Sequence, residues 1–268
     1  MTRPVPILMY HAVTDTPTER CQPLAVRPRA FADQLAYLRD QGFTALTATQ
    51  LAALRRGADG AALPERPVVL TFDDGYADFH TTALPTLQRY GFTATLFVAT
   101  DWLAGGPGSQ RAPGPMLTWS QVAEVAAAGI EIGGHTHTHP QLDQLPEAAV
   151  RSEVADSKKL LEDRVQQPVA SLAYPYGYSD ARVRQVVRET GYTSAWAVSN
   201  VLPRPDHDPF ALPRLTMNHA TTPERFRDVV HGRRIPVIYL GQRAKTKGKA
   251  LYRRSRALAG RTLTGRGR

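Results

Sequence analysis

Residues 67–75 read PVVLTFDDG, an apolar run rich in β-branched side chains that ends abruptly in two aspartates and a glycine. A short apolar run of this kind, bounded by turn residues, predicts a buried strand. In parallel β/α proteins the carboxyl ends of such strands gather the catalytic side chains. Asp-Gly is also a common turn sequence, so the pair Asp73-Asp74 fits an ordinary turn and a functional site equally well.

Strand-like and helix-like segments alternate on both sides of this run. Further strands are predicted over residues 4–13, 93–100, 131–136, 169–177 and 193–199. Periodicity and end signals predict helices over residues 29–42, 47–57, 77–91, 117–129, 146–165 and 179–191. Six or seven β-α units up to residue 232 predict an α/β protein with a parallel sheet or barrel, short of the eight units of a TIM barrel.

Charge is unevenly distributed along the 268 residues. The chain has 33 Lys and Arg against 24 Asp and Glu, but 12 of the basic residues and none of the acidic ones fall in residues 233–268. Residues 1–232 therefore hold 21 basic and 24 acidic residues, a net charge of about −3. We expect a single domain over 1–232 and a basic tail over 233–268 that is disordered or a frayed helix. This balance disfavours nucleic acid as a partner and makes the tail a candidate for contact with an anionic membrane surface.

Two absences set the expected location. No apolar run approaches the roughly 18 residues of a membrane-spanning helix. The N-terminal MTRPVPILMYHAV lacks the apolar core and the small-residue cleavage site of a signal peptide. We therefore expect a cytoplasmic protein that is peripheral to the membrane where the tail contacts it. The single cysteine, Cys21, excludes an internal disulfide and a cysteine-based zinc site.

A second cluster, GGHTHTHP over residues 133–140, follows another short apolar strand. His135 and His139 are four residues apart, a spacing that predicts both imidazoles on one side of a single helical turn. Two imidazoles and one carboxylate would fill three of the four positions around a tetrahedral zinc ion and leave the fourth for water. The second aspartate of the Asp73-Asp74 pair would then be free to act as a general base.

Two weaker signals lie at other strand ends. LAYPYG, residues 172–177, predicts either a strand that ends in a Pro/Gly turn with packed aromatic side chains or a rigid functional turn. Such a turn would offer a backbone N–H to an oxyanion and an aromatic wall to a sugar ring. His11, in the Met-Tyr-His of residues 9–11, ends the first apolar strand, where a lone histidine is more often a satisfied core or surface residue.

Taken together, the order and spacing of these motifs resemble the polysaccharide deacetylase family, family 4 of the carbohydrate esterases. TFDDG (71–75) is similar to the first motif of the family and His135-Thr136-x-x-His139 to the second. YPYG (174–177) and the N-terminal Tyr-His resemble the branch that contains the biofilm poly-N-acetylglucosamine deacetylases. The resemblance covers about residues 5–232 and implies a distorted (β/α)7 barrel as a single catalytic domain.

The same resemblance implies a role for each motif residue. Asp73 would be the catalytic base, and Asp74, His135 and His139 would be the metal ligands. The backbone N–H of Tyr176 would help to form the oxyanion hole.

The general acid and the residue that orients the base are less clearly marked. In the branch named above the acid is the N-terminal histidine, which corresponds to His11; the rival is His219, in Met217-Asn218-His219. Many members of the family carry an arginine in the third motif where this sequence has Ala173, and Arg214 is a candidate to supply that charge from another strand end. Candidate substrate-contacting or supporting residues are Arg214, Trp196, Tyr174 and His219.

The activity that the resemblance implies is metal-dependent removal of acetyl groups from an N-acetylated sugar or polysaccharide of the poly-N-acetylglucosamine type. This is hydrolysis of a non-peptide carbon–nitrogen bond that releases acetate. The expected ion is Zn²⁺, with Co²⁺, Ni²⁺ or Mn²⁺ as alternatives at the same ligands. Two other functions stay open: a deacylase or amidohydrolase of a small non-sugar amide, and a catalytically silent glycan-binding protein that keeps the fold.

Overall fold

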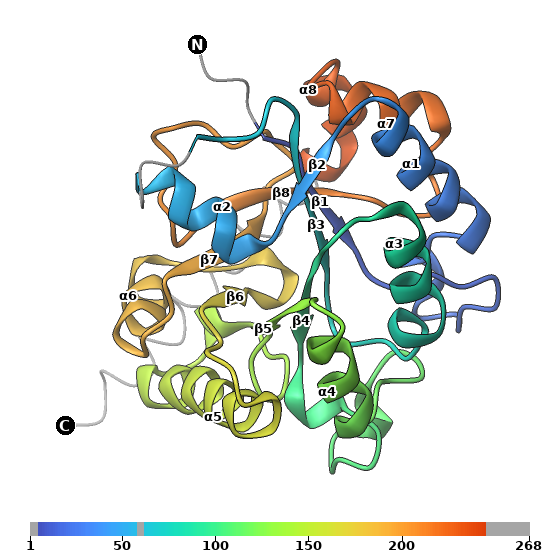
Figure 1. The fold of residues 1–268 in the computed structure, drawn as a ribbon. Coiled ribbons are helices and arrows are strands. Elements are labelled where there is room, and N and C mark those ends of the chain that lie inside the picture. Colours follow the sequence, from blue (N-terminus) through green and yellow to red (C-terminus); the bar gives the residue numbers. More distant parts are fainter. Residues whose placement is uncertain (1–4, 58–61, 245–268) are drawn as a thin grey trace.

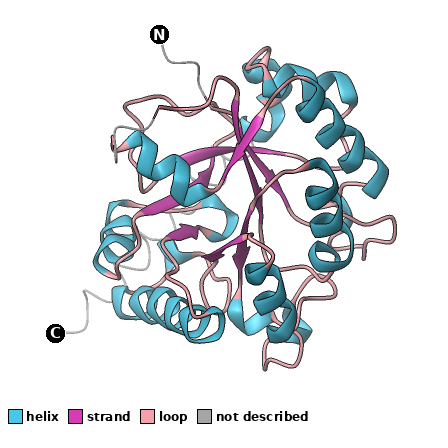
Figure 2. Ribbon diagram, viewed as in Figure 1, coloured by secondary structure: helices cyan, strands magenta, loops and turns pink. Residues whose placement is uncertain are grey.

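The computed structural model describes residues 5–57 and 62–244. In this part of the chain eight parallel strands form one sheet that curls around a central core, with helices on the outside (Figure 1; Figure 2). The strands are β1 (Ile7–Tyr10), β2 (Thr44–Leu46), β3 (Pro67–Phe72), β4 (Thr95–Val98), β5 (Glu131–Gly134), β6 (Ser171–Ala173), β7 (Ser194–Val198) and β8 (Leu212–Thr216). The helices are α1 (Pro28–Asp40), α2 (Ala48–Arg55), α3 (Leu84–Tyr90), α4 (Trp119–Ala127), α5 (Glu147–Val165), α6 (Ala181–Glu189), α7 (Pro223–Val230) and α8 (Ile235–Ile238).

Strand β1 closes the sheet because it pairs with both β3 and β8. Leu8 lies opposite Leu70 on one side and opposite Leu215 on the other. Strands β1, β3, β4, β5, β6, β7 and β8 thus form a closed ring of seven. The three-residue strand β2 pairs with the first half of β3, outside the ring. The predicted distorted (β/α)7 barrel is confirmed.

Apolar side chains fill two layers, one inside the barrel and one between the barrel and its helices. Successive residues of a strand point to opposite faces. Ile7 and Val69 therefore point into the barrel, whereas Leu8 and Leu70 face the helices. Trp196 lies in the inner layer and is fully buried there. The side chains that fill the barrel make it a packed core, and ligands are left to the two rims.

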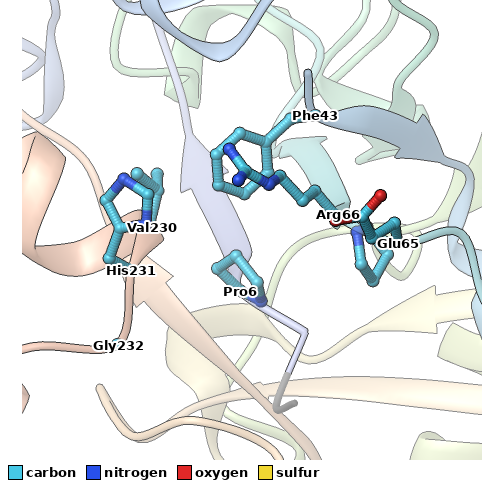
Figure 3. Close-up of a pocket in the computed structure, with 8 residues that line it drawn as sticks. Pro6, Phe43, Glu65, Arg66, Val230, His231 and Gly232 are labelled. Carbon is cyan, nitrogen blue, oxygen red and sulfur yellow. The ribbon is translucent and has the colours of Figure 1, made fainter. Parts of the chain in front are cut away.

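A pocket of about 400 Å³ opens at the amino-terminal rim, near the starts of β1 and β3. The rings of Phe43 and His231, whose centroids are 5.8 Å apart, line it together with Pro6 and Arg66 (Figure 3). None of the site residues predicted from the sequence is among the eight residues that line this pocket. The predicted catalytic groups lie at the opposite rim.

The first residues of the expected tail pack against the barrel. Ile235 and Tyr239 are buried in the layer between barrel and helices, and the Tyr239 hydroxyl donates to the Thr216 carbonyl at the end of β8 at 3.0 Å. Residues 245–268, which carry nine of the twelve basic residues, lie outside the described part of the chain, so contact of the tail with a membrane surface stays a prediction. Within residues 5–57 and 62–244, no helix combines the length and the apolar character needed to cross a membrane.

We predict that a chain ended after Gly232 is less stable than the full chain. It loses the burial of Ile235 and Tyr239, which stabilises the fold by roughly 3–6 kcal/mol at 1.5–3 kcal/mol for each side chain. A chain ended after Ala244 keeps these contacts and is the matched control, with an unfolding midpoint close to that of the full chain. Denaturant unfolding of the three proteins measures the difference, and equal stability of the shortest chain would contradict the expectation.

Candidate metal centre and active site

The candidate site lies at the carboxyl-terminal rim of the barrel. His11 follows β1, Asp73 and Asp74 follow β3, and His135 follows β5. Because all strands of the ring run in the same direction, their carboxyl ends meet at one rim, and residues far apart in the sequence come together there.

The chain turns sharply after β3. Asp73 continues the strand, and its N–H donates to the Tyr10 carbonyl of β1 at 3.0 Å. Asp74 and Gly75 then adopt left-handed backbone conformations, with φ of 76° and 93°. Glycine takes such angles freely and aspartate tolerates them better than most residues. The turn gives the two neighbouring carboxylates different partners.

The loop that joins the two histidines is irregular, so the prediction of a helical turn from their spacing was wrong. Thr136 and His139 have positive φ values of 67° and 60°. The Thr136 hydroxyl accepts a hydrogen bond from the His139 N–H at 3.1 Å and holds the loop closed. Two left-handed residues, and not a helical repeat, turn the His135 and His139 rings toward one point.

Asp74, His135 and His139 form a buried triad. Asp74 Oδ1 lies 3.3 Å from the Nε2 atom of each histidine. One ligand atom from each of the three residues lies within 4.8 Å of the others, so the triad could hold a metal ion. The side chains are 2–7% exposed, which shields the centre from bulk water.

The hydrogen bonds of the triad suit a cation. His135 Nδ1 lies 2.8 Å from the Ala173 carbonyl, which can only accept, so Nδ1 carries the proton and the neutral ring leaves a lone pair on Nε2. Asp74 Oδ1 and His139 Nδ1 are buried and have no hydrogen-bond partner among the described residues. Asp74 Oδ1 faces the Nε2 lone pair of His135, and two acceptor atoms in this position need a shared positive charge, which a divalent ion supplies.

The surroundings of the Asp74 carboxylate favour its ionised form. Burial alone would raise the pKa of Asp74, but its contacts with His135 and His139 outweigh burial and hold this pKa well below the usual range. Burial likewise would lower the pKa of His135, yet the carboxylates of Asp73 and Asp74 raise it overall. The centre therefore presents an anionic oxygen beside two imidazoles.

Asp73 is paired with Arg214, which reaches it from β8. Arg214 Nη1 donates to Oδ1 at 2.6 Å and Nη2 to Oδ2 at 2.8 Å, a bidentate pair in which the arginine is fully buried. Further hydrogen bonds to the Thr71 hydroxyl and the Ala197 carbonyl fix the guanidinium. Burial would raise the pKa of Asp73, but Arg214 and His135 outweigh it and lower the pKa. Arg214 thus places a charge beside Asp73 from the middle of another strand.

The YPYG segment forms a tight turn after β6. Tyr176 has a φ of 59°, and Gly177 has a φ of 75° and lies so close to Val198 that a Cβ would come within 2.5 Å of it. Tyr174 is fully buried and donates to the Phe210 carbonyl at 2.9 Å, which places it in the packing layer. Tyr176 is 52% exposed, and its ring centroid lies 4.9 Å from that of His139, at the mouth of the site.

Trp102 contacts the site although no sequence motif marked it. Its ring centroid lies 4.2 Å from that of His139. The residue belongs to a short 3-10 turn, Thr100–Trp102, that follows β4. The Gly/Pro-rich composition of residues 102–116 predicts a surface loop, yet Trp102 is only 8% exposed. The one available signal was its place at the end of a predicted strand.

The two rival histidines occupy different places. His11 Nδ1 is buried without a hydrogen-bond partner among the described residues. Burial lowers the pKa of His11, opposed by the nearby carboxylates of Asp74 and Asp73. His219 is exposed, lies 3.1 Å from the Pro23 carbonyl and lines a separate cavity of about 440 Å³. The structure brings His11 and not His219 to the aspartates.

Comparison with known proteins identifies the family. The model of the family described as "Polysaccharide deacetylase" matches residues 60–195, about half of the chain. The chain belongs to this family. The Bacillus subtilis (strain 168) protein YxkH is 34% identical over 188 residues, which are 70% of this chain and 62% of that protein. The Escherichia coli (strain K12) poly-beta-1,6-N-acetyl-D-glucosamine N-deacetylase is 34% identical over 137 residues, 48% of this chain and 20% of that protein. The structure of Streptococcus pyogenes deacetylase PplD in complex with acetate aligns with a TM-score of 0.75 and 26% identity, over 85% of this chain and 98% of that one.

We predict that Arg214→Met destabilises the fold by about 3–5 kcal/mol, because it leaves the Asp73 carboxylate buried and unpaired. The loss is expected to shrink as the pH falls. Because the pKa of Asp73 is lowered in the folded wild type, its ionised carboxylate stabilises the fold at neutral pH. This contribution to the free energy of unfolding is lost when acid protonates the carboxylate. In the variant, burial raises the pKa of Asp73, so protonation relieves the penalty. Denaturant unfolding as a function of pH measures both proteins, and a pH-independent difference would contradict the pairing argument.

Proposed function

We propose that this chain is a metal-dependent N-deacetylase that hydrolyses the acetamide of an N-acetylated sugar polymer and releases acetate. The observation that carries the proposal is the convergence of buried Asp74, His135 and His139 on one point, with the Asp73-Arg214 pair beside them. Membership of the polysaccharide deacetylase family supports this activity. The name of the E. coli relative supports a poly-N-acetylglucosamine type of substrate, although this chain spans only a fifth of that protein.

Asp74, His135 and His139 would hold the ion. One carboxylate and two imidazoles favour zinc, with Co²⁺, Ni²⁺ or Mn²⁺ as alternatives at the same donor set. When bound, such an ion supplies Lewis-acid polarisation of the amide carbonyl and an acidified water.

Asp73 is proposed as the general base. Arg214 holds this carboxylate ionised and fixes its plane, so that each oxygen still has a lone pair that the guanidinium does not use. Asp73 Oδ2 lies 4.0 Å from His135 Nε2, which places the base next to the proposed metal position without making it a ligand. The Asp73 carboxylate would therefore be placed to accept a proton beside the triad.

His11 and Tyr176 are proposed to act on the acetamide from two sides. The backbone N–H of Tyr176 would donate to the developing oxyanion, and the left-handed conformation of this residue sets the direction of its peptide. His11 would protonate the leaving nitrogen. Its unpartnered buried Nδ1 and its position at the end of β1 support this role.

We predict that variants of the two neighbouring aspartates differ in how much metal they bind. Asp74→Ala is expected to lose both the bound metal and the activity. Asp73→Asn is expected to keep about one equivalent of metal while kcat for acetate release falls by roughly 10²–10⁴-fold, the range of general acid–base catalysis. Metal analysis and acetate release from N-acetylglucosamine oligomers measure the two effects, and an unfolding curve checks that each variant is folded. Loss of metal from Asp73→Asn would mean that the roles are shared.

We predict that His11→Ala lowers kcat by roughly 10²–10⁴-fold and removes the fall in rate at high pH, because a general acid must be protonated to act. Its metal content should not change. His219→Ala is the matched control and is expected to keep near-normal kinetics. The reverse pattern in kcat–pH profiles would move the acid to His219.

A further inference from the structure

The loop between the two histidines is held from outside the site by helix α5. The Glu153 carboxylate accepts three hydrogen bonds from this loop: Oε2 from the His137 N–H at 2.9 Å and the Thr138 N–H at 2.8 Å, and Oε1 from the Thr138 hydroxyl at 2.6 Å. The Glu153 carbonyl adds a longer bond from the His137 N–H at 3.1 Å. All of these contacts fall between His135 and His139.

The loop has a shape that it would not keep by itself. Thr136 and His139 both have a left-handed backbone conformation, which residues other than glycine keep only where the surrounding structure enforces it. A carboxylate that accepts two backbone N–H groups forms stronger hydrogen bonds than a neutral acceptor. Glu153 sits on a 19-residue helix whose buried face packs against the barrel, so these bonds tie the loop to a rigid support.

A second support comes from the short turn that follows β4. The Thr100 hydroxyl lies 2.8 Å from His137 Nδ1, and the Asp101 N–H donates to the His137 carbonyl at 2.9 Å. The side chain and the carbonyl of His137 are therefore both held by the turn after β4. The middle of the loop is clamped between this turn and Glu153, and its two ends carry the imidazoles.

We propose that Glu153 is a positioning residue of the metal centre. It shapes the loop so that the two Nε2 atoms converge on Asp74, and it does so without touching the ion. The inference rests on the proposed function, because it takes the triad as the metal site. Residues that orient ligands from outside typically change metal affinity by 10–100-fold when they are replaced.

The test compares zinc binding by the full-length wild type, Glu153→Gln, Glu153→Ala and Asp156→Asn. Asp156 is an exposed acidic residue of the same helix, so its variant is a control for the lost charge. Each protein is stripped with a chelator and titrated with Zn²⁺ in competition with a chromogenic chelator, and its thermal unfolding is recorded without metal. Glutamine keeps the size of the side chain and one acceptor oxygen, so this variant is expected to fold even where the alanine variant does not.

We expect Glu153→Gln to raise the Kd for zinc about 10-fold and Glu153→Ala to raise it further, with the metal-free Tm of Glu153→Gln near that of the wild type. Asp156→Asn should bind zinc as the wild type does. Wild-type affinity in the folded Glu153→Gln and Glu153→Ala proteins would overturn the inference and leave the proposed metal site intact. Failure of the wild type itself to bind zinc would overturn the proposed function, and the inference with it.

Discussion

The bidentate ion pair between Asp73 and Arg214 is the interaction on which the site depends. It joins the end of β3 to the middle of β8, across β1, and both side chains are buried. A buried carboxylate is costly unless a cation compensates it, and without one it takes up a proton. Arg214 compensates Asp73, whereas Asp74 Oδ1 has no hydrogen-bond partner among the described residues and faces two imidazoles with which it could hold a metal ion. Two identical side chains next to each other in the sequence thereby have different partners, which suits the different tasks that we propose for them.

Backbone strain is concentrated where these side chains meet. Asp74, His139 and Tyr176 all have positive φ, at a cost of about 1–3 kcal/mol each. The cost has a geometric cause, since β4 separates β3 from β5 in the ring and regular strand ends would keep Asp74 and His139 apart. Sharp reversals at the strand ends bring both to one point. The surrounding packed barrel supplies the stability that offsets this strain.

Local patterns in the sequence predicted most of the strands and helices and the two polar clusters at strand ends, whereas the seven-unit barrel and the role of each site residue were implied by the family resemblance. A buried strand that ends in polar residues is visible within nine residues, as in PVVLTFDDG. Strand β8 was missed as a regular strand since Arg214 interrupts its apolar run, and this charge inside the barrel is what Asp73 requires. The helical turn predicted for His135 and His139 was wrong because spacing does not report the left-handed residues between them. Trp102 and Glu153 act through contacts between distant elements, which no local pattern records.

The site has two separate mechanical supports. The interior of the barrel fixes the Asp73-Arg214 pair, whereas α5 and the turn after β4 fix the loop that carries His139. Asp74 lies 3.3 Å from both imidazoles although its backbone follows β3, and Asp73 Oδ2 lies 4.0 Å from His135 Nε2. Changes on the outer helix can therefore alter how firmly the imidazoles are held without moving the base, and changes inside the barrel can alter the base without moving the imidazoles. Under the proposed roles, a site with two supports lets substitutions on α5 act mainly on metal affinity and substitutions inside the barrel act mainly on proton transfer, although the two aspartates are neighbours in the sequence.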